Sequence, residues 1–160
     1  MKVLIAVDDS QFSKDMLDDL TSRQWWGDTE FMVLNVMALP DENSWEDWGL
    51  TVSLDIIESM QADAEQLVKE SVERLRKKLP AEMPVHGKIA RGHTVDAIVQ
   101  AAQEWQADMI MLSTHNRRGL QRFVFGSVAE SLLPKAPCSV EIVRHRDSIR
   151  KRPRRHSRSA

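Results

Sequence analysis

Residues 3–10 read VLIAVDDS, a short apolar run that ends in two aspartates and a serine. An apolar run without alternation is typical of a β-strand that is buried on both faces, as in a parallel sheet. Ser10 follows the acidic pair and is placed to cap the next helix, because its side-chain oxygen can accept a backbone N–H. The stretch therefore predicts the first strand of an α/β domain and the turn into a helix.

Strand and helix patterns alternate along the rest of the chain. Further apolar runs predict strands at residues 31–37, 85–90, 109–112 and 140–143. Apolar residues at helical spacing predict helices within residues 12–20, 54–79 and 95–102, and a short one that starts at 127. This alternation predicts an α/β fold, an open doubly wound five-stranded parallel sheet with helices on both faces.

Three helix ends carry recognisable signals. Thr94 is expected to cap the helix that follows the third strand. Ser127, with Glu130 three residues later, matches the capping-box pattern at the start of the last helix. Pro80 and Pro84 are expected to close the long second helix.

Composition indicates one soluble domain over residues 1–144. The hydrophobic fraction is 42% and the charged fraction 29%, which are ordinary values for a globular protein. No apolar run approaches the roughly 20 residues that cross a bilayer, so we expect no membrane association. Cys138 is the only cysteine, which excludes an internal disulfide and favours a cytoplasmic location. It is interpreted as a small apolar filler.

The end of the chain is basic, whereas the remainder is acidic. Residues 144–160 contain eight lysines and arginines against one acid, while the whole chain has a net charge of −2. Residues 145–160 have almost no apolar content and are predicted to form a disordered tail. Such a tail can contact a nucleic-acid backbone, but the acidic body opposes this, and a nucleic-acid partner is not expected.

Candidate binding residues lie where the predicted strands end. In open α/β sheets, ligands bind beyond the carboxyl ends of the strands, which here are residues 8–10, 35–37 and 113–127. Gly126 and Ser127 at a helix start are a natural phosphate seat, and arginines at 117, 118 and 122 could add positive charge. The alternative is that Ser127 is only a helix cap and the arginines form a solvated face.

Several classes of catalytic site are absent from the sequence. There is no phosphate-binding P-loop, no G-x-G-x-x-G run, no nucleophile elbow and no zinc spacing of His and Cys. His115 lies in the loop after the fourth strand without an acid or nucleophile at motif spacing. It is interpreted either as a phosphate contact or as a surface residue. We expect no dedicated catalysis.

These stretches together resemble the universal stress protein family over residues 1–144. The resemblance is carried by residues 3–10 and 31–36, by RGHT at 91–94, by STHNRRGL at 113–120, by FGSV at 125–128 and by APCSV at 136–140. It implies a Rossmann-like, adenine nucleotide alpha-hydrolase-like fold. It also implies a regulatory function in the stress response that is delivered through partners.

Nucleotide-binding members of that family carry glycine, two residues, glycine, nine residues, then glycine and serine or threonine. The spacing is kept here, but Ser113 and Asn116 replace the first two glycines. Asn116 tolerates a left-handed backbone, whereas Ser113 adds a side chain where a ligand would approach. The residues that the resemblance places around ATP or another adenine nucleotide, with Mg, are Asp8, Val36, Ser113, His115, Asn116, Gly126, Ser127 and Val128.

The resemblance also implies a homodimer through the last strand. The residues expected to pair are Val140, Glu141, Ile142 and Val143. A bare, short, apolar edge would favour such pairing. Two functions stay open at this point. One is a regulatory protein that binds an adenine nucleotide weakly, and the other is an interaction module without a nucleotide.

Overall fold

The computed structural model describes residues 1–38, 54–114 and 126–144. The elements are β1 (Lys2–Ala6), α1 (Gln11–Thr21), β2 (Glu30–Met37), α3 (Leu54–Arg76), β3 (Val85–Arg91), α4 (Thr94–Trp105), β4 (Met109–Thr114), α5 (Ser127–Leu132) and β5 (Ser139–Arg144). All five predicted strands are present at the predicted places. The predicted basic tail at 145–160 lies outside the described residues, as do His115 and Asn116.

The strands form one parallel sheet in the order β3-β2-β1-β4-β5. β1 is central, and its Val3 pairs in register with Phe31 of β2 and Met109 of β4. β2 and β3 follow β1 on one side, whereas β4 and β5 extend the sheet on the other. The doubly wound α/β fold that the alternation predicted is confirmed.

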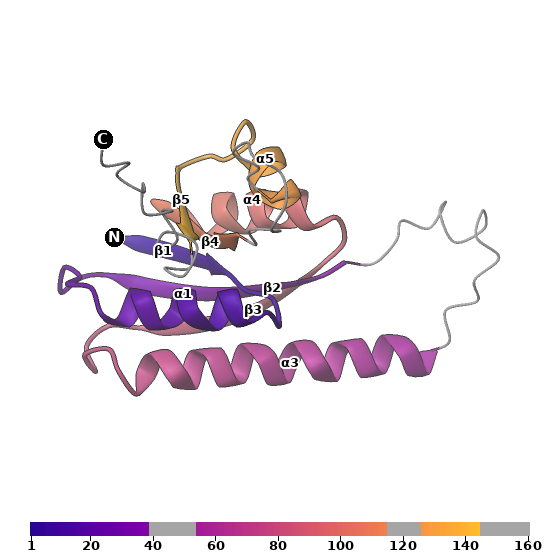
Figure 1. Ribbon diagram of the computed structural model, residues 1–160, viewed down its shortest axis with the longest axis horizontal. Coiled ribbons are helices and arrows are strands. Elements are labelled where there is room, and N and C mark those ends of the chain that lie inside the picture. The colour runs from indigo at the N-terminus through magenta and orange to yellow at the C-terminus, as the bar shows by residue number, and fades with distance from the viewer. Residues whose placement is uncertain (39–53, 115–125, 145–160) are drawn as a thin grey trace, which may run out of the picture.

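Helices cover both faces of the sheet, as Figure 1 shows. Helices α1 and α3 lie against one face, and helices α4 and α5 lie against the other. No helix in the described part of the chain is long and apolar enough to cross a membrane.

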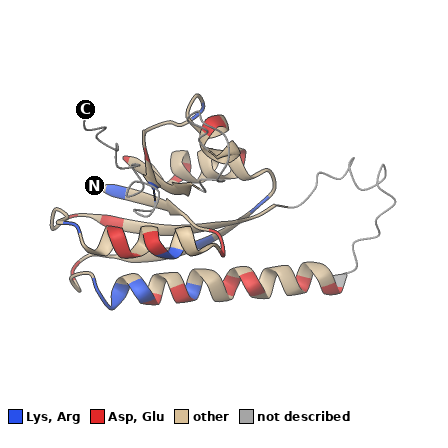
Figure 2. Cartoon of the chain, viewed as in Figure 1, with Lys and Arg blue, Asp and Glu red and all other residues tan. Residues whose placement is uncertain are grey.

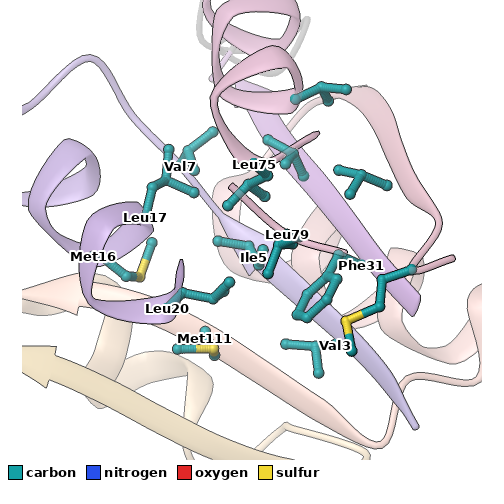
Figure 3. Packing of buried hydrophobic residues seen from close by; sticks show 14 of the residues in the cluster. Val3, Ile5, Val7, Met16, Leu17, Leu20, Phe31, Leu75, Leu79 and Met111 are labelled. Carbon is teal, nitrogen blue, oxygen red and sulfur yellow. The ribbon is translucent and has the colours of Figure 1, made fainter. Parts of the chain in front are cut away.

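The larger core cluster joins the sheet to α1 and α3 (Figure 3). Its fully buried members include Val3, Ile5, Met16, Leu20, Phe31, Leu75 and Met111. The other cluster joins Leu4, Leu34, Ile110 and Leu112 to residues of α4 and α5. Successive residues of β1 thus pack into the cores on opposite faces of the sheet. This explains why apolar and polar residues do not alternate along the first strand.

An ion-pair network ties α1 to α3 on the surface. Asp18 of α1 accepts hydrogen bonds from Arg74 Nε at 3.0 Å and from Lys78 Nζ at 2.7 Å. Figure 2 shows the acidic residues along α1 and the basic residues toward the end of α3. Opposite charges therefore meet where the two helices run side by side.

The predicted helix ends are partly wrong. Ser10 caps α1 as expected, since its side chain accepts the Ser13 N–H. The helices α4 and α5 instead have His93 and Gly126 at the N-cap, and neither makes a side-chain cap bond. Thr94 and Ser127 are already the first helical residues, because the extended backbone ends one residue earlier than the hydroxyl pattern indicated.

Candidate functional site

The strand order reverses between β1 and β4. From β1 the chain winds to β2 and β3, and β4 then returns to the opposite side of β1. Ala6 pairs with Leu112, so the residues that follow β1 lie beside Ser113. In open parallel sheets this switch point is where the connecting loops diverge and leave room for a ligand.

Asp8 projects from the turn after β1, and three donors among the described residues contact its carboxylate. Asp8 Oδ1 accepts the Ser10 N–H at 3.2 Å, the Ser10 hydroxyl at 2.5 Å and the Ser13 hydroxyl at 2.5 Å. Hydrogen bonds to an ionised group are stronger than neutral ones. The position of this predicted site residue is therefore well defined, with its side chain at the exposed mouth of the switch point.

Ser13 connects Asp8 to Ser113, and the sequence prediction missed it. Ser13 is 2% exposed, and its Oγ also accepts the Asp8 backbone N–H at 3.0 Å. The Ser113 Oγ lies 3.4 Å from the Ser13 Oγ. The sequence did contain a signal for Ser13, because it shares the buried face of the helix with Met16 and Leu20. A buried polar side chain needs a hydrogen-bond partner.

Ser113 itself belongs to strand β4 rather than to the loop in which it was expected. β4 extends to Thr114, and Ser113 pairs in register with Val143 of β5. Its side chain lies on the α1 face of the sheet, where it contacts Ser13. The extra Cβ and hydroxyl are therefore accommodated by a polar contact between β4 and α1.

The backbone amide of Gly126 is hydrogen-bonded to the last residue of strand β4. Its N–H donates to Thr114 Oγ1 at 3.2 Å, and Thr114 is 7% exposed. The Gly126 amide is therefore not unpaired in this structure, and its part in a phosphate seat stays a prediction. Helix α5 spans only Ser127–Leu132, so its dipole adds little to a phosphate seat.

The remaining predicted residues are arranged around this centre. Val36 of β2 is half-buried against the α4 and α5 core, as is Val128, whereas Ser127 is exposed. Asn35 Nδ2 donates to Val7 O at 2.9 Å and so ties the end of β2 to the end of β1. The structure thus brings Asp8 and Ser113 together through Ser13, and links Gly126 to β4 through Thr114.

Neither a metal site nor a reactive thiol emerges from the described residues. Within residues 1–38, 54–114 and 126–144, no three His, Cys, Asp or Glu side chains are grouped to hold a metal ion. Burial, together with the charge of Asp108, raises the pKa of the Cys138 thiol. A raised pKa keeps the thiol protonated, which agrees with its role as apolar filler in the α4 and α5 core.

Residues 1–144 match the sequence model of the universal stress protein family. The chain belongs to the universal stress protein family. This universal stress protein is similar to one from Methanocaldococcus jannaschii, at 27% identity over 149 residues that cover 89% of this chain and 81% of the relative.

Solved structures of other universal stress proteins have the same fold. One from Arabidopsis thaliana, with AMP bound, superposes with a TM-score of 0.64 at 18% identity and covers 96% of this chain and 97% of its own. Another, in complex with cAMP, superposes with a TM-score of 0.66 at 16% identity and covers 89% of this chain and 96% of its own. At these identities the likeness establishes the fold alone.

Proposed function

We propose that this universal stress protein binds an adenine nucleotide at the carboxyl ends of β1 and β4. The observation that carries the proposal is the convergence of Asp8 and Ser113 at the switch point, where one buried hydroxyl, that of Ser13, holds both. The protein then acts in the stress response as a cytoplasmic regulator through partners, and dedicated catalysis is not part of the proposal.

The chemistry of the site supports a nucleoside. The carboxylate of Asp8 can accept a hydrogen bond from a ribose hydroxyl or from an amino group of a base. Half-buried apolar side chains such as Val36 and Val128 offer a surface for a ring. The two family structures that hold AMP and cAMP support the adenine nucleotide as ligand class.

Weak binding is part of the proposal. Ser113 occupies a position at which nucleotide-binding family members have glycine, and the Gly126 amide is already bonded to Thr114. Each of these features removes a backbone contact that a nucleotide could otherwise make. We expect dissociation constants for adenine nucleotides in the range of about 10 μM to 1 mM, which corresponds to about −7 to −4 kcal/mol.

The test combines the nucleotide content of freshly purified protein with calorimetric titration of ATP, AMP and adenosine, each with and without magnesium. Gly126→Asp is the diagnostic variant, and Gly126→Ala is its matched control. The backbone of Gly126 has φ −55°, and an added Cβ would lie 3.6 Å from Thr114 Oγ1, which is an ordinary contact. Both variants should therefore fold, and only the aspartate adds a negative charge.

We expect saturable binding in the wild-type protein and in Gly126→Ala, and weaker binding of the phosphorylated ligands in Gly126→Asp. If none of the three ligands binds at millimolar concentration, the nucleotide proposal is wrong. The search would then move to protein partners, as the alternative of a nucleotide-free interaction module requires.

We further propose that the protein forms a homodimer through β5. This strand lies at the edge of the sheet, and Val140, Ile142 and Val143 are only half-buried in the single chain. An edge strand presents unpaired backbone groups that a second copy can bond. Sedimentation velocity over a hundredfold range of concentration tests the proposal, and a monomer at every concentration would refute it.

A further inference from the structure

Strand β3 forms the edge of the sheet opposite β5, and alternate residues of it point their backbone groups away from the sheet. The Phe31 N–H donates to Pro84 O, and the Gly92 N–H donates to Met37 O. Since alternate residues of a parallel strand bond the same neighbour, these two bonds assign the even-numbered residues of β3 to β2. The odd-numbered residues within 85–91 therefore present their N–H and C=O groups to the outside.

The outward backbone groups in the middle of β3 are open. Val85 O, near one end of the strand, accepts a hydrogen bond from Arg76 Nη2 at 2.7 Å. Among the residues that the structure describes, none is hydrogen-bonded to the outward groups of Gly87 and Ile89. A sheet edge with unpaired donors and acceptors is a template for a further strand.

This part of the edge borders an open groove of about 500 Å³ between β3 and α3. Gly87 lies directly against α3, since an added Cβ would be 2.6 Å from Val68 Cγ1 and 3.3 Å from Val72 Cγ2. A glycine within a strand often marks a place where another backbone can approach closely. Gly87 is therefore the middle of the accessible edge.

The rim of the groove on α3 carries alternating charges, in the order Glu65, Lys69, Glu73 and Arg76. Their spacing of four, four and three residues places them on one face of the helix, and Figure 2 shows both signs of charge in this half of α3. Lys69 and Glu73 have the spacing of an ion pair within a helix. Neither of them is in an ion pair with any described residue.

This order of charges is complementary to itself when a second copy lies antiparallel. Glu65 then faces Arg76 of the second copy, and Lys69 faces Glu73 of the second copy. Both pairings place the two-fold axis near residues 70–71 of α3.

The glycine of β3 indicates the same axis independently. Gly87 lies against Val68 and Val72, whose midpoint along the helix is residue 70. The charge pattern of α3 and the open middle of β3 thus agree on one two-fold axis. An interface between identical copies requires this kind of self-complementary surface.

We propose that the β3 edge and the charged rim of α3 form an interface with a second copy of this chain. The two β3 strands pair antiparallel about Gly87, so that Val85 lies opposite Ile89 of the second copy. Val85 O has a second lone pair and Arg76 has further N–H donors, so their bond can be kept. This interface lies at the opposite edge from the proposed β5 pairing, and the two together join dimers into a larger assembly.

The test is sedimentation velocity of the full chain over a hundredfold range of concentration at low ionic strength. Lys69→Glu brings like charges together at Glu73 of the second copy, and the double variant Lys69→Glu/Glu73→Lys restores opposite charges. Lys77→Glu is the matched control, because it makes the same change in net charge at an exposed lysine outside the rim.

We expect Lys69→Glu to raise the dissociation constant of this association about tenfold, whereas the double variant should stay within about threefold of wild type. Lys77→Glu should also stay within about threefold. Raising the salt concentration from about 50 mM to about 500 mM should weaken the association of wild type, because exposed charges are screened.

Ile89→Pro tests the pairing of the strands. Proline at this position removes an N–H that points outward and leaves the hydrogen bonds of β3 to β2 in place. Ile89→Ala is the control for the loss of the half-buried side chain. We expect Ile89→Pro to weaken the association about tenfold more than Ile89→Ala does, and equal effects would overturn the pairing of the strands.

The other outcomes separate this interface from the proposed pairing of β5. Association that is equally strong in wild type and Lys69→Glu, or that the double variant fails to restore, would overturn the β3 interface and leave the β5 pairing intact. A monomer at every concentration would overturn both.

Discussion

Arg23 Nη2 lies 2.6 Å from Glu141 Oε1 and joins the turn after helix α1 to the edge strand β5. The same Nη2 lies 2.6 Å from Asp19 Oδ2 one helical turn earlier. The hydrogen bond to Glu141 is the largest cause of a raised Arg23 pKa, and the hydrogen bond to Asp19 adds to it. The strand proposed to pair with a second copy is thereby anchored to the domain through its side chains as well as through β4.

Removal of this anchor should cost a modest amount of stability. The Arg23 and Glu141 side chains are 32% and 33% exposed, so solvent screens much of their attraction. We expect Arg23→Met to lower the free energy of unfolding by about 1 kcal/mol in urea titrations. In a double-mutant cycle with Glu141→Gln, the two losses should not add, and strict additivity would show that the contact contributes nothing.

The buried face of α3 should be far more sensitive than its exposed face. Leu75 is fully buried between α3 and the sheet, whereas Ile56 on the same helix is 53% exposed. We expect Leu75→Ala to lower the free energy of unfolding by about 2–5 kcal/mol, because it leaves a cavity as well as losing apolar burial. Ile56→Ala, the matched control, should change stability by about 0.5 kcal/mol or less. Equal effects of both variants would contradict the described packing.

Gly87 of β3 should not tolerate a side chain. A Cβ at this position would lie 2.6 Å from Val68 Cγ1 and 3.3 Å from Val72 Cγ2, both on α3. We expect Gly87→Ala to destabilise the protein by about 1–3 kcal/mol through overpacking.

The cause can be checked by making room for the new methyl group. Adding Val68→Ala should recover part of the loss in Gly87→Ala, so that the double variant is more stable than additivity predicts. Gly126→Ala meets no such contact and serves as the neutral control for the same substitution. If Val68→Ala fails to relieve the effect, a clash with α3 is not its origin.

Acid should weaken the link between α1 and α3. Hydrogen bonds from Arg74 and then Lys78 lower the pKa of Asp18 from 3.8 to about 2. A depressed folded-state pKa contributes stability above the unfolded pKa, and this contribution is lost as the pH falls through the folded pKa. We therefore expect the stability difference between wild type and Asp18→Asn to be full at pH 6 and to shrink between pH 3.8 and about 2.

The size of this effect is limited because the Asp18 side chain is 42% exposed. At pH 6 we expect wild type to exceed Asp18→Asn by about 1 kcal/mol or less in urea unfolding. Asp63→Asn, an exposed change on α3, is the matched control for the loss of a surface carboxylate and should change the free energy of unfolding at pH 6 by about 0.5 kcal/mol or less. A difference between wild type and Asp18→Asn that stays constant down to about pH 2 would contradict the described ion pairs.

Much of the fold was predictable because it depends on local patterns. The apolar run of β1 indicated a strand buried on both faces, and its alternate residues do pack into opposite cores. Ser10 was identified as a cap from the residue type alone, and the structure confirms it. At α4 and α5 the same reasoning failed by one residue, because a hydroxyl residue can also occupy the first helical position.

The candidate site was predictable in outline only. Asp8 was found because a strand end in an α/β fold is a place for a ligand, and Ser113 because of the family pattern. Ser13, which joins them, lies 100 residues from Ser113 in the chain and carries no motif. Its partners depend on β1 and β4 being neighbours, and periodicity does not encode which strands are adjacent.

The sequence by itself determined the elements, the parallel α/β architecture and the family, since all three follow from residue order and short-range periodicity. Only the tertiary structure decided the strand order, the contact of Arg23 with Glu141, and the hydroxyl chain from Asp8 through Ser13 to Ser113. It also decided that the Gly126 amide is bonded to Thr114. These contacts arise between segments that are distant in the chain, which short-range periodicity does not bring together.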